Sequence, residues 1–145
     1  MKKPVARAGI VAYYLEDQNI LIRLMIPSNS DFGGIKPQVA KGRVEEGEHI
    51  QETAVREGEE ELGLKRSNFA ESVVSIGEFP IIGQEEKYIF HCFAVRVKNL
   101  EDFNTPHFET GWSGWMPCEQ ALSRIKNGQK ELLLATINKI KQLHF

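Results

Sequence analysis

Residues 42–64 of the chain read GRVEEGEHIQETAVREGEEELGL. If this stretch is helical, Glu57, Glu60 and Glu61 lie on one face, because residues three and four positions apart are neighbours on a helix surface. Carboxylates held so close repel one another, and a fold that keeps them together normally supplies a compensating cation. Oxygen ligands of this kind suit Mg²⁺ or Mn²⁺. The stretch therefore predicts a divalent metal site.

The same stretch resembles the Nudix hydrolase signature GX5EX7REUXEEXGU, in which U is an aliphatic residue. One position departs from the pattern, because Gly58 stands where the family has an aliphatic residue. A glycine there weakens a helix by about 1 kcal/mol relative to alanine. It suggests either a close approach of the helix to a sheet or a tolerated cost. The other positions of the signature match: Gly42, Glu48, Arg56, Glu57, Glu60, Glu61, Gly63 and Leu64.

The resemblance implies a Mg²⁺ cofactor, with Mn²⁺ as an alternative, held by Glu57, Glu60 and Glu61 with the Gly42 carbonyl as a further ligand. Arg56 would orient the carboxylates through charge-assisted hydrogen bonds. Arg56, Glu57 and Glu60 are therefore assigned to the catalytic set. The remaining acid of the signature, at position 48, is expected to fix a loop rather than to bind the metal.

A plainer interpretation is a solvated, acidic amphipathic helix over residues 45–62. In that case Ala54, Val55, Gly58 and Leu62 form its buried stripe. Such a helix needs neither glycines at both ends nor three carboxylates at the border of the stripe, so the metal site is the favoured interpretation.

The general base can come from the signature or from a later loop, where Glu85, Glu86 and Glu109 are candidates. Each can equally be a solvated surface acid, since acids are mostly exposed. Glu109 is preferred and joins the catalytic set, because HFETGWSGWMP (107–117) resembles the acidic-aromatic segment that many Nudix enzymes carry before their final helices.

Substrate recognition is predicted from basic and aromatic residues. Lys41, in VAKGRVEEGE, partly resembles the PKG segment of dinucleoside polyphosphate hydrolases and related RNA 5′-pyrophosphohydrolases. Lys41, Arg43 and Lys87 can pair with phosphates, or they can be ordinary surface charges. Tyr88 is assigned to the substrate site as a surface on which a base could stack, as Trp112 and Phe108 also could, although such aromatics are more often core residues.

The resemblance implies Mg²⁺-dependent hydrolysis of a phosphoanhydride bond in a nucleoside diphosphate linked to another group, with a dinucleoside polyphosphate as the first candidate. Alternatives are hydrolysis of ADP-ribose or nucleoside triphosphates, removal of pyrophosphate from an RNA 5′ end, and a nucleotide-sensing module without catalysis. A net charge of −2 argues against a general nucleic-acid surface.

Composition predicts one compact domain over residues 1–145, since 41% of the 145 residues are hydrophobic. Cys92 and Cys118 show no CxxC spacing, which indicates reduced thiols and a cytoplasmic location. No apolar run reaches transmembrane length, and the first residues lack the hydrophobic core of a signal peptide. Monomer and homodimer are both compatible with the sequence.

Strands and helices are expected to alternate in an α/β/α sandwich with a central mixed sheet, which is also the fold that the resemblance implies. Residues 16–19, EDQN, are expected to form a hairpin turn, and residues 27–37 and 80–87 are expected to be loops. Helices are expected from Pro117 and over 129–143, the second with an apolar side. The expected strands are 6–15, 20–26, 73–79, 88–97 and 112–116.

Overall fold

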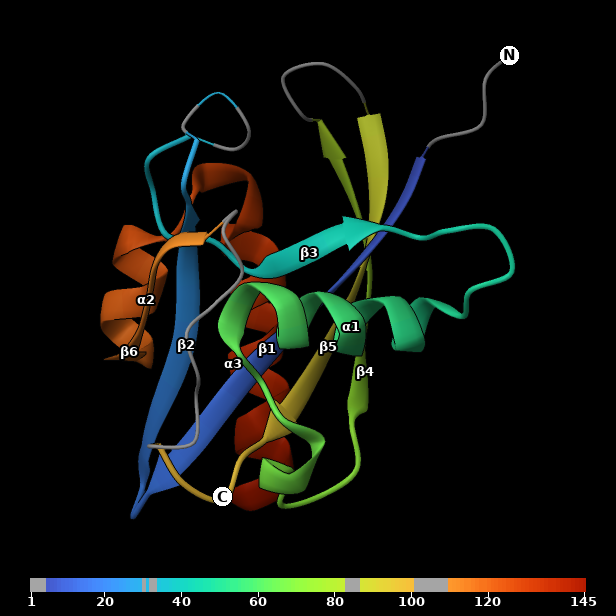
Figure 1. Ribbon diagram of the computed structural model, residues 1–145. Coiled ribbons are helices and arrows are strands. Elements are labelled where there is room, and N and C mark those ends of the chain that lie inside the picture. The colour runs from blue at the N-terminus through green and yellow to red at the C-terminus, as the bar shows by residue number, and fades with distance from the viewer. Residues whose placement is uncertain (1–4, 30, 32–33, 83–86, 101–109) are drawn as a thin grey trace.

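The computed structural model describes residues 5–29, 31, 34–82, 87–100 and 110–145 (Figure 1). Its described strands form one mixed sheet of six, in the order β4-β5-β1-β2-β6, with β3 paired to β1. The β1–β5 pair is parallel, and the other pairs are antiparallel. The strands are β1 (Val5–Glu16), β2 (Asn19–Pro27), β3 (Ala40–Arg43), β4 (Val74–Ile82), β5 (Lys87–Arg96) and β6 (Thr110–Pro117).

The hairpin between β1 and β2 forms where it was predicted. Glu16 pairs with Asn19, so Asp17 and Gln18 make the turn. Asp17 has a φ of 57°, a left-handed conformation that aspartate tolerates better than most side chains.

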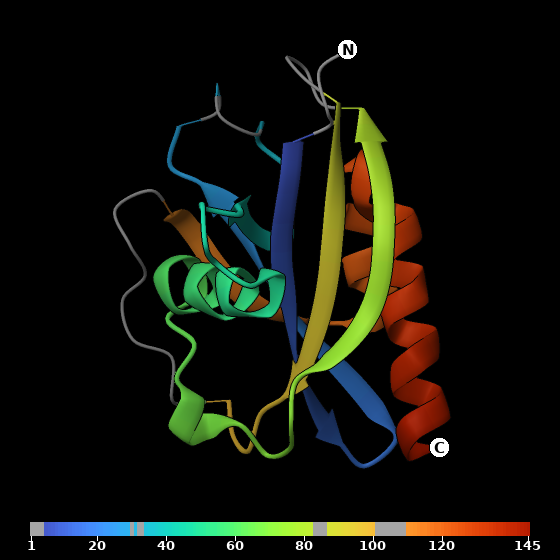
Figure 2. The ribbon, with the colours of Figure 1, turned by 90° about the vertical axis from the view of Figure 1, so that its right-hand side faces the viewer.

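Helices cover both faces of the sheet (Figure 2). On one face lies α1 (Ile50–Leu62), and on the other lie α2 (Cys118–Arg124) and α3 (Lys130–His144), with the short 3₁₀ turns η2 (Arg66–Asn68) and η3 (Asn127–Gln129) between elements. Two apolar clusters fill the layers: one joins α1 to Ala8 and Ile10 of β1, and the other joins α2 and α3 to the opposite face. The expected α/β/α sandwich is therefore confirmed.

Two expectations about element boundaries were wrong, and one strand was missed. Residues 80–82 continue β4 instead of forming a loop, because Ile81 is buried in the core and Pro80 lies on an edge strand, where no ladder donor is needed. Pro117 ends β6 opposite Leu21, and the helix begins one residue later. Strand β3 was not anticipated.

Among the described residues, no helix combines the length and the apolar character needed to span a membrane.

Candidate active site

Helix α1 carries most of the signature and packs closely on the sheet. Its buried residues include Ala54, Val55, Gly58 and Leu62, which confirms the predicted apolar stripe. A Cβ on Gly58 would lie 2.6 Å from Cγ2 of Ile10 in β1. The glycine therefore permits a close approach of helix and strand, which explains the one departure from the signature.

Helix α1 ends in a left-handed residue, Gly63, with a φ of 74°. The N–H of Leu64 then donates to the Gly58 carbonyl at 3.2 Å. Glycine accepts this backbone conformation without the steric cost that a Cβ would bring, which accounts for the glycine near the end of the signature.

Arg56 is the hub of the acidic cluster. Its Nε and Nη2 donate to the two carboxylate oxygens of Glu48 at 2.9 and 3.1 Å, and its Nη1 donates to Oε1 of Glu57 at 3.0 Å. The same Nη1 lies 3.6 Å from Oε1 of Glu60. The hydrogen bonds that Arg56 donates to Glu48 raise the pKa of Arg56. Arg56 is thus placed to orient Glu57 and Glu60, the role that the resemblance implies.

Glu48 fixes the turn before α1. Besides the two bonds from Arg56, it accepts hydrogen bonds from Oγ1 of Thr53 at 2.6 Å and from the backbone N–H of Glu45 at 3.2 Å. The bonds from Arg56, followed by that from Thr53, lower the pKa of Glu48 to about 2. Its oxygens are occupied by these donors, which agrees with a structural role.

Strand β3 holds the next two residues of the site against α1. The backbone N–H of Lys41 donates to Oε2 of Glu61 at 2.9 Å. A Cβ on Gly42 would collide with the carboxylate of Glu57. Glycine at position 42 therefore leaves the space into which the Glu57 carboxylate fits.

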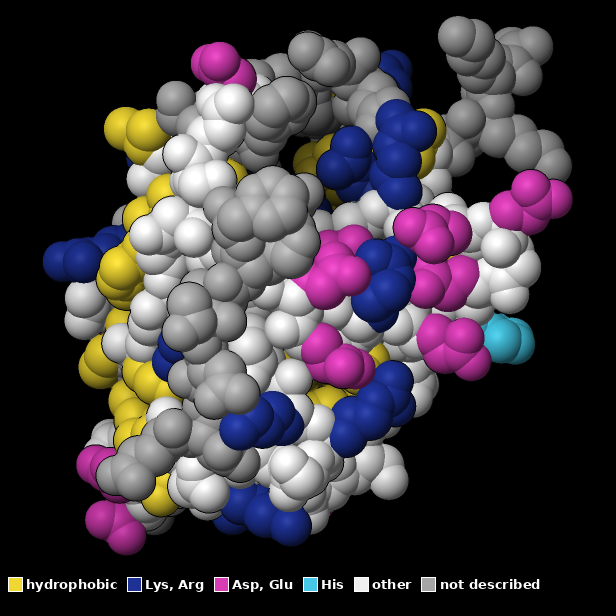
Figure 3. Space-filling model, viewed as in Figure 1, with side chains coloured by type: hydrophobic (Ala, Val, Ile, Leu, Met, Phe, Trp, Pro, Cys, Tyr) yellow, Lys and Arg dark blue, Asp and Glu magenta, His cyan; other side chains and the backbone are white. Residues whose placement is uncertain are grey.

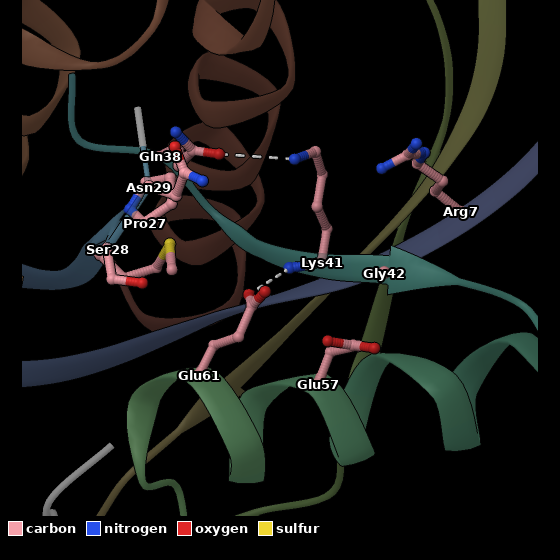
Figure 4. Close-up of a pocket in the computed structure, with 10 residues that line it drawn as sticks. Arg7, Pro27, Ser28, Asn29, Gln38, Lys41, Gly42, Glu57 and Glu61 are labelled. Carbon is pink, nitrogen blue, oxygen red and sulfur yellow. Dashed lines mark hydrogen bonds between the residues drawn. The ribbon is translucent and has the colours of Figure 1, made fainter. Parts of the chain in front are cut away.

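A cleft of about 580 Å³ opens beside β3 (Figure 4). Figure 4 shows the carboxylates of Glu57 and Glu61 on one side of β3 and the side chains of Arg7 and Lys41 on the other. In Figure 3 acidic side chains gather over α1. The residues that line the cleft are Arg7, Met25, Pro27, Ser28, Asn29, Gln38, Lys41, Gly42, Glu57 and Glu61.

Lys41 lies in a strongly charged environment. Burial, followed by the charge of Lys126, lowers its pKa to about 8, and the carboxylates of Glu61 and Glu57 act in the opposite direction. Its Nζ donates to Oε1 of Gln38 at 3.4 Å. The amine is therefore held at the cleft rather than extended into solvent.

Other predicted substrate residues lie outside the cleft. Arg43 is exposed and its carbonyl accepts a hydrogen bond from Arg56, while Lys87 is exposed at the start of β5. Tyr88 is only 6% exposed and belongs to the core. Its expected role as an open stacking surface is therefore corrected. Trp112 is 42% exposed on β6 but does not line the cleft.

The candidate general bases from later loops, Glu85, Glu86 and Glu109, lie outside the described residues, as does Phe108.

Arg7 is a charged residue of the cleft that the sequence prediction missed. Its guanidinium Cζ lies 4.8 Å from the centre of the Tyr88 ring, so the buried tyrosine supports a cation at the cleft. The available signal was a single arginine in the apolar strand sequence VARAGIVA.

The residues present suit a hard divalent cation. Glu57 and Glu61 line one cleft, Glu60 shares an Arg56 nitrogen with Glu57, and carboxylate oxygens are the donors that Mg²⁺ and Mn²⁺ prefer. As they stand, no three acidic, histidine or cysteine side chains in the described part of the chain are close enough together to hold a metal. The side chain of Glu60 is 43% exposed, so it has room to change rotamer.

Comparison with solved structures shows the same fold at low sequence identity. A Caenorhabditis elegans Ap4A hydrolase in a binary complex has a TM-score of 0.78 at 18% identity, covering 95% of this chain and 98% of that one. The NUDIX domain of Shewanella oneidensis NrtR, complexed with ADP ribose, has a TM-score of 0.76 at 13% identity, covering 97% and 90%. A mutT/nudix family protein from Listeria innocua has a TM-score of 0.73 at 19% identity, covering 97% of each chain.

No curated protein matches the sequence significantly. The model of the NUDIX domain family, by contrast, matches residues 3–135, nearly the whole length of the chain. With the signature in α1, the cleft beside it and the shared fold, this match shows that the chain belongs to the Nudix family and is a Nudix hydrolase, an enzyme that acts on pyrophosphate bonds.

Proposed function

We propose that the chain catalyses metal-dependent hydrolysis of a phosphoanhydride bond in a nucleoside diphosphate linked to another group, with a dinucleoside polyphosphate such as Ap4A as the first candidate. The observation that carries this proposal is the cleft with two unlike walls, carboxylates from α1 on one side and Lys41 with Arg7 on the other. A polyphosphate suits both walls, because its oxygens bind cationic side chains directly and bind carboxylates through a metal ion. The shared fold with an Ap4A hydrolase supports this choice.

The proposed metal ligands are Glu57, Glu60 and Glu61, with the carbonyl of Gly42. When bound, Mg²⁺ or Mn²⁺ offsets charge on the attacked phosphate and lowers the pKa of a bound water. Arg56 holds Glu57 and Glu60 in position, and Lys41 neutralises phosphate charge. Glu109 is proposed as the general base, while Arg43 and Lys87 attract the anionic substrate from the surface.

ADP-ribose is the second candidate, because the NUDIX domain of NrtR, which shares the fold, was solved in complex with ADP ribose. The remaining alternatives are hydrolysis of nucleoside triphosphates, hydrolysis at RNA 5′ ends, and nucleotide sensing without turnover.

We further propose that the protein works as one domain in the cytoplasm. The thiols of Cys92 and Cys118 are free and buried, as is usual in a reducing compartment.

A substrate panel separates these alternatives. Purified protein is incubated with Ap4A, ADP-ribose, FAD, nucleoside triphosphates and 5′-triphosphorylated RNA, with Mg²⁺ or Mn²⁺, and the products are identified. The proposal expects a mononucleotide and a larger nucleotide from Ap4A, whereas ADP-ribose hydrolysis yields AMP and ribose phosphate. Nucleotide binding without turnover of any compound would favour the sensing module.

Substitution of one carboxylate tests the proposed site within the same assay. Glu60→Gln should reduce turnover by about 10²-fold or more, because the transition state loses a metal ligand while folding is little changed. Glu59→Gln is the matched control, since this neighbouring acid pairs with Arg66 at the surface, 3.3 Å away. Equal activities of the two variants would contradict the assignment.

A further inference from the structure

Glu61 lies in the last turn of α1, where a helix provides no donor of its own for the backbone carbonyls. The cap at the end of α1 serves a different carbonyl, because the N–H groups of Gly63 and Leu64 both donate to Gly58. The carbonyl of Glu61 instead accepts a hydrogen bond from Oγ1 of Thr110, the first residue of β6, at 2.9 Å. A side chain 49 positions away therefore stabilises this end of the helix.

The side chain of Glu61 is held from a second strand. Its Oε2 accepts a hydrogen bond from the backbone N–H of Lys41 in β3, at 2.9 Å (Figure 4). A carboxylate bonded at one oxygen keeps its direction only while the backbone that carries it keeps its place. Since β6 holds the backbone and β3 holds the side chain, the direction of this carboxylate depends on both strands.

Thr110 is itself fixed at the rim of the cleft. In the β2–β6 ladder it lies opposite Pro27, where the register of the two strands shifts. The next residue, Gly111, packs on the same segment, because a Cβ there would lie 3.1 Å from Cα of Ser28 and 3.2 Å from the carbonyl oxygen of Pro27. Pro27, Ser28 and Glu61 all line the cleft. Thr110 thus connects the end of the acidic helix to the rim beside it.

We propose that Thr110 is a positioning residue for the metal site. Its hydroxyl fixes the last turn of α1 and, with it, the direction in which Glu61 presents its carboxylate. Groups that orient metal ligands typically matter for function, since their loss lowers metal affinity or activity about 10- to 100-fold. This role rests on the proposed function in one respect, because it takes Glu61 as a metal ligand.

The first experiment measures metal binding without substrate. Mn²⁺ alone is titrated into the purified protein, and the unbound ion is quantified by electron paramagnetic resonance. Thr110→Val keeps the shape of the side chain but removes the donor, so it should weaken Mn²⁺ binding about tenfold. Thr110→Ser keeps the donor and should restore most of the affinity. If Thr110→Val does not fold, Thr110→Ala, which removes the same donor, carries the test.

Thr136→Val is the matched control. Oγ1 of the buried Thr136 donates to the Leu132 carbonyl at 2.8 Å in α3, on the other face of the sheet from α1. This variant also loses a hydroxyl bond to a helix carbonyl, so it should lower the melting temperature without changing Mn²⁺ affinity. Wild-type affinity in Thr110→Val, or an equal loss in Thr110→Ser, would overturn the positioning role. Absence of Mn²⁺ binding to the wild-type protein would overturn it as well.

The second experiment measures turnover at saturating Mn²⁺. In Thr110→Val, kcat for Ap4A should fall about tenfold or more while KM changes little, because a misdirected ligand weakens stabilisation of the transition state rather than nucleotide binding. In a Glu61→Gln background the same substitution should have little further effect, because the carboxylate that it positions has been removed. Full additivity of the two substitutions would show that Thr110 does not act through Glu61.

These measurements separate the positioning role from the proposed function. Mn²⁺ binding with the predicted mutational pattern, but without turnover of any diphosphate compound, would support the role of Thr110 and refute the proposed function. Hydrolysis of a nucleotide with unchanged kcat and Mn²⁺ affinity in Thr110→Val would support the proposed function and refute the role of Thr110.

Discussion

At the scale of single residues, Glu48 binds Arg56 through both carboxylate oxygens, and its side chain is 16% exposed. Glu48→Gln should lower the free energy of unfolding by about 1–2 kcal/mol at neutral pH, because a charge-assisted pair becomes a weaker one. The folded pKa of about 2 lies below the ordinary value of 4.5. The stabilisation is therefore complete above about pH 4.5 and is lost as the pH falls toward 2.

Urea unfolding of wild type and Glu48→Gln at neutral pH and at about pH 3 measures this effect, and the gap between the two proteins should narrow at the lower pH. Glu59→Gln serves as the control, with an expected change below about 0.5 kcal/mol, because its pair with Arg66 is exposed. A gap that is the same at both pH values would contradict the assignment of the low pKa to Glu48.

At position 42 the absence of a Cβ leaves room for the carboxylate of Glu57. In Gly42→Ala the added methyl group displaces the carboxylate of Glu57. We expect kcat/KM to fall by about 10²-fold, since a shift of about 1 Å in a catalytic group has that effect, with little change in the melting temperature. Gly128→Ala is the matched control, because its Cβ meets only Cγ2 of Ile81, at 3.8 Å. Full activity in Gly42→Ala would show that the position of Glu57 is not critical.

At the scale of elements, the distance between α1 and the sheet depends on Gly58. Alanine there improves helix propensity by about 1 kcal/mol, but its Cβ would lie 2.6 Å from Ile10 and 3.0 Å from Leu64. Overpacking of this kind costs about 1–3 kcal/mol, so we expect a net loss of stability in Gly58→Ala and a displaced helix with reduced activity.

A double-mutant cycle with Ile10→Ala isolates this contact. The double variant should be more stable than the sum of the single effects predicts, because the smaller residue at position 10 makes room for the methyl group. Strict additivity in urea unfolding would rule out the proposed clash.

At the scale of the whole molecule, the first strand is tied to the last helix. Oη of the buried Tyr13 lies 2.9 Å from Nε2 of His144, 131 positions away in the sequence. Nε2 of His144 also lies 3.8 Å from Oε2 of Glu71, which pairs with Arg96 at 3.1 Å. Tyr13→Phe should therefore destabilise the protein by about 1 kcal/mol at neutral pH.

The burial of the Tyr13 hydroxyl also makes the stability of the fold depend on pH in the alkaline range. Burial, followed by the charge of Glu71, raises the pKa of Tyr13 from 10.0 to about 12. Its stabilisation is therefore present in full below about pH 10 and is lost as the pH rises to 12, because the unfolded chain ionises first. Thermal unfolding should show a smaller alkaline loss of stability in Tyr13→Phe than in wild type. Tyr14→Phe, at the half-buried neighbouring position, controls for general alkaline effects. An identical alkaline loss of stability in wild type, Tyr13→Phe and Tyr14→Phe would contradict the raised pKa of Tyr13.

The fold and part of the site could be predicted because their signals are local. The apolar stripe of α1, the hairpin at Asp17 and the apolar side of α3 depend on residues within a few positions of one another, so periodicity and turn chemistry reveal them. Strand β3 is short and was missed, since a stretch of this length carries no periodic pattern of its own. Tyr88 was misassigned because a strand aromatic looks the same in the sequence whether it faces a cleft or the core.

The sequence by itself determined the family signature, the helix that carries it and the spacing of its three carboxylates, because a helical turn needs only near neighbours. Tertiary structure alone decided which groups face those carboxylates. The pairing of β1 with β3 and β5 brings Arg7 to the cleft and places Tyr88 beneath it, and β3 turns the N–H of Lys41 onto Glu61. These contacts join residues far apart in the chain, and strand register, which depends on the packing of the whole sheet, sets them.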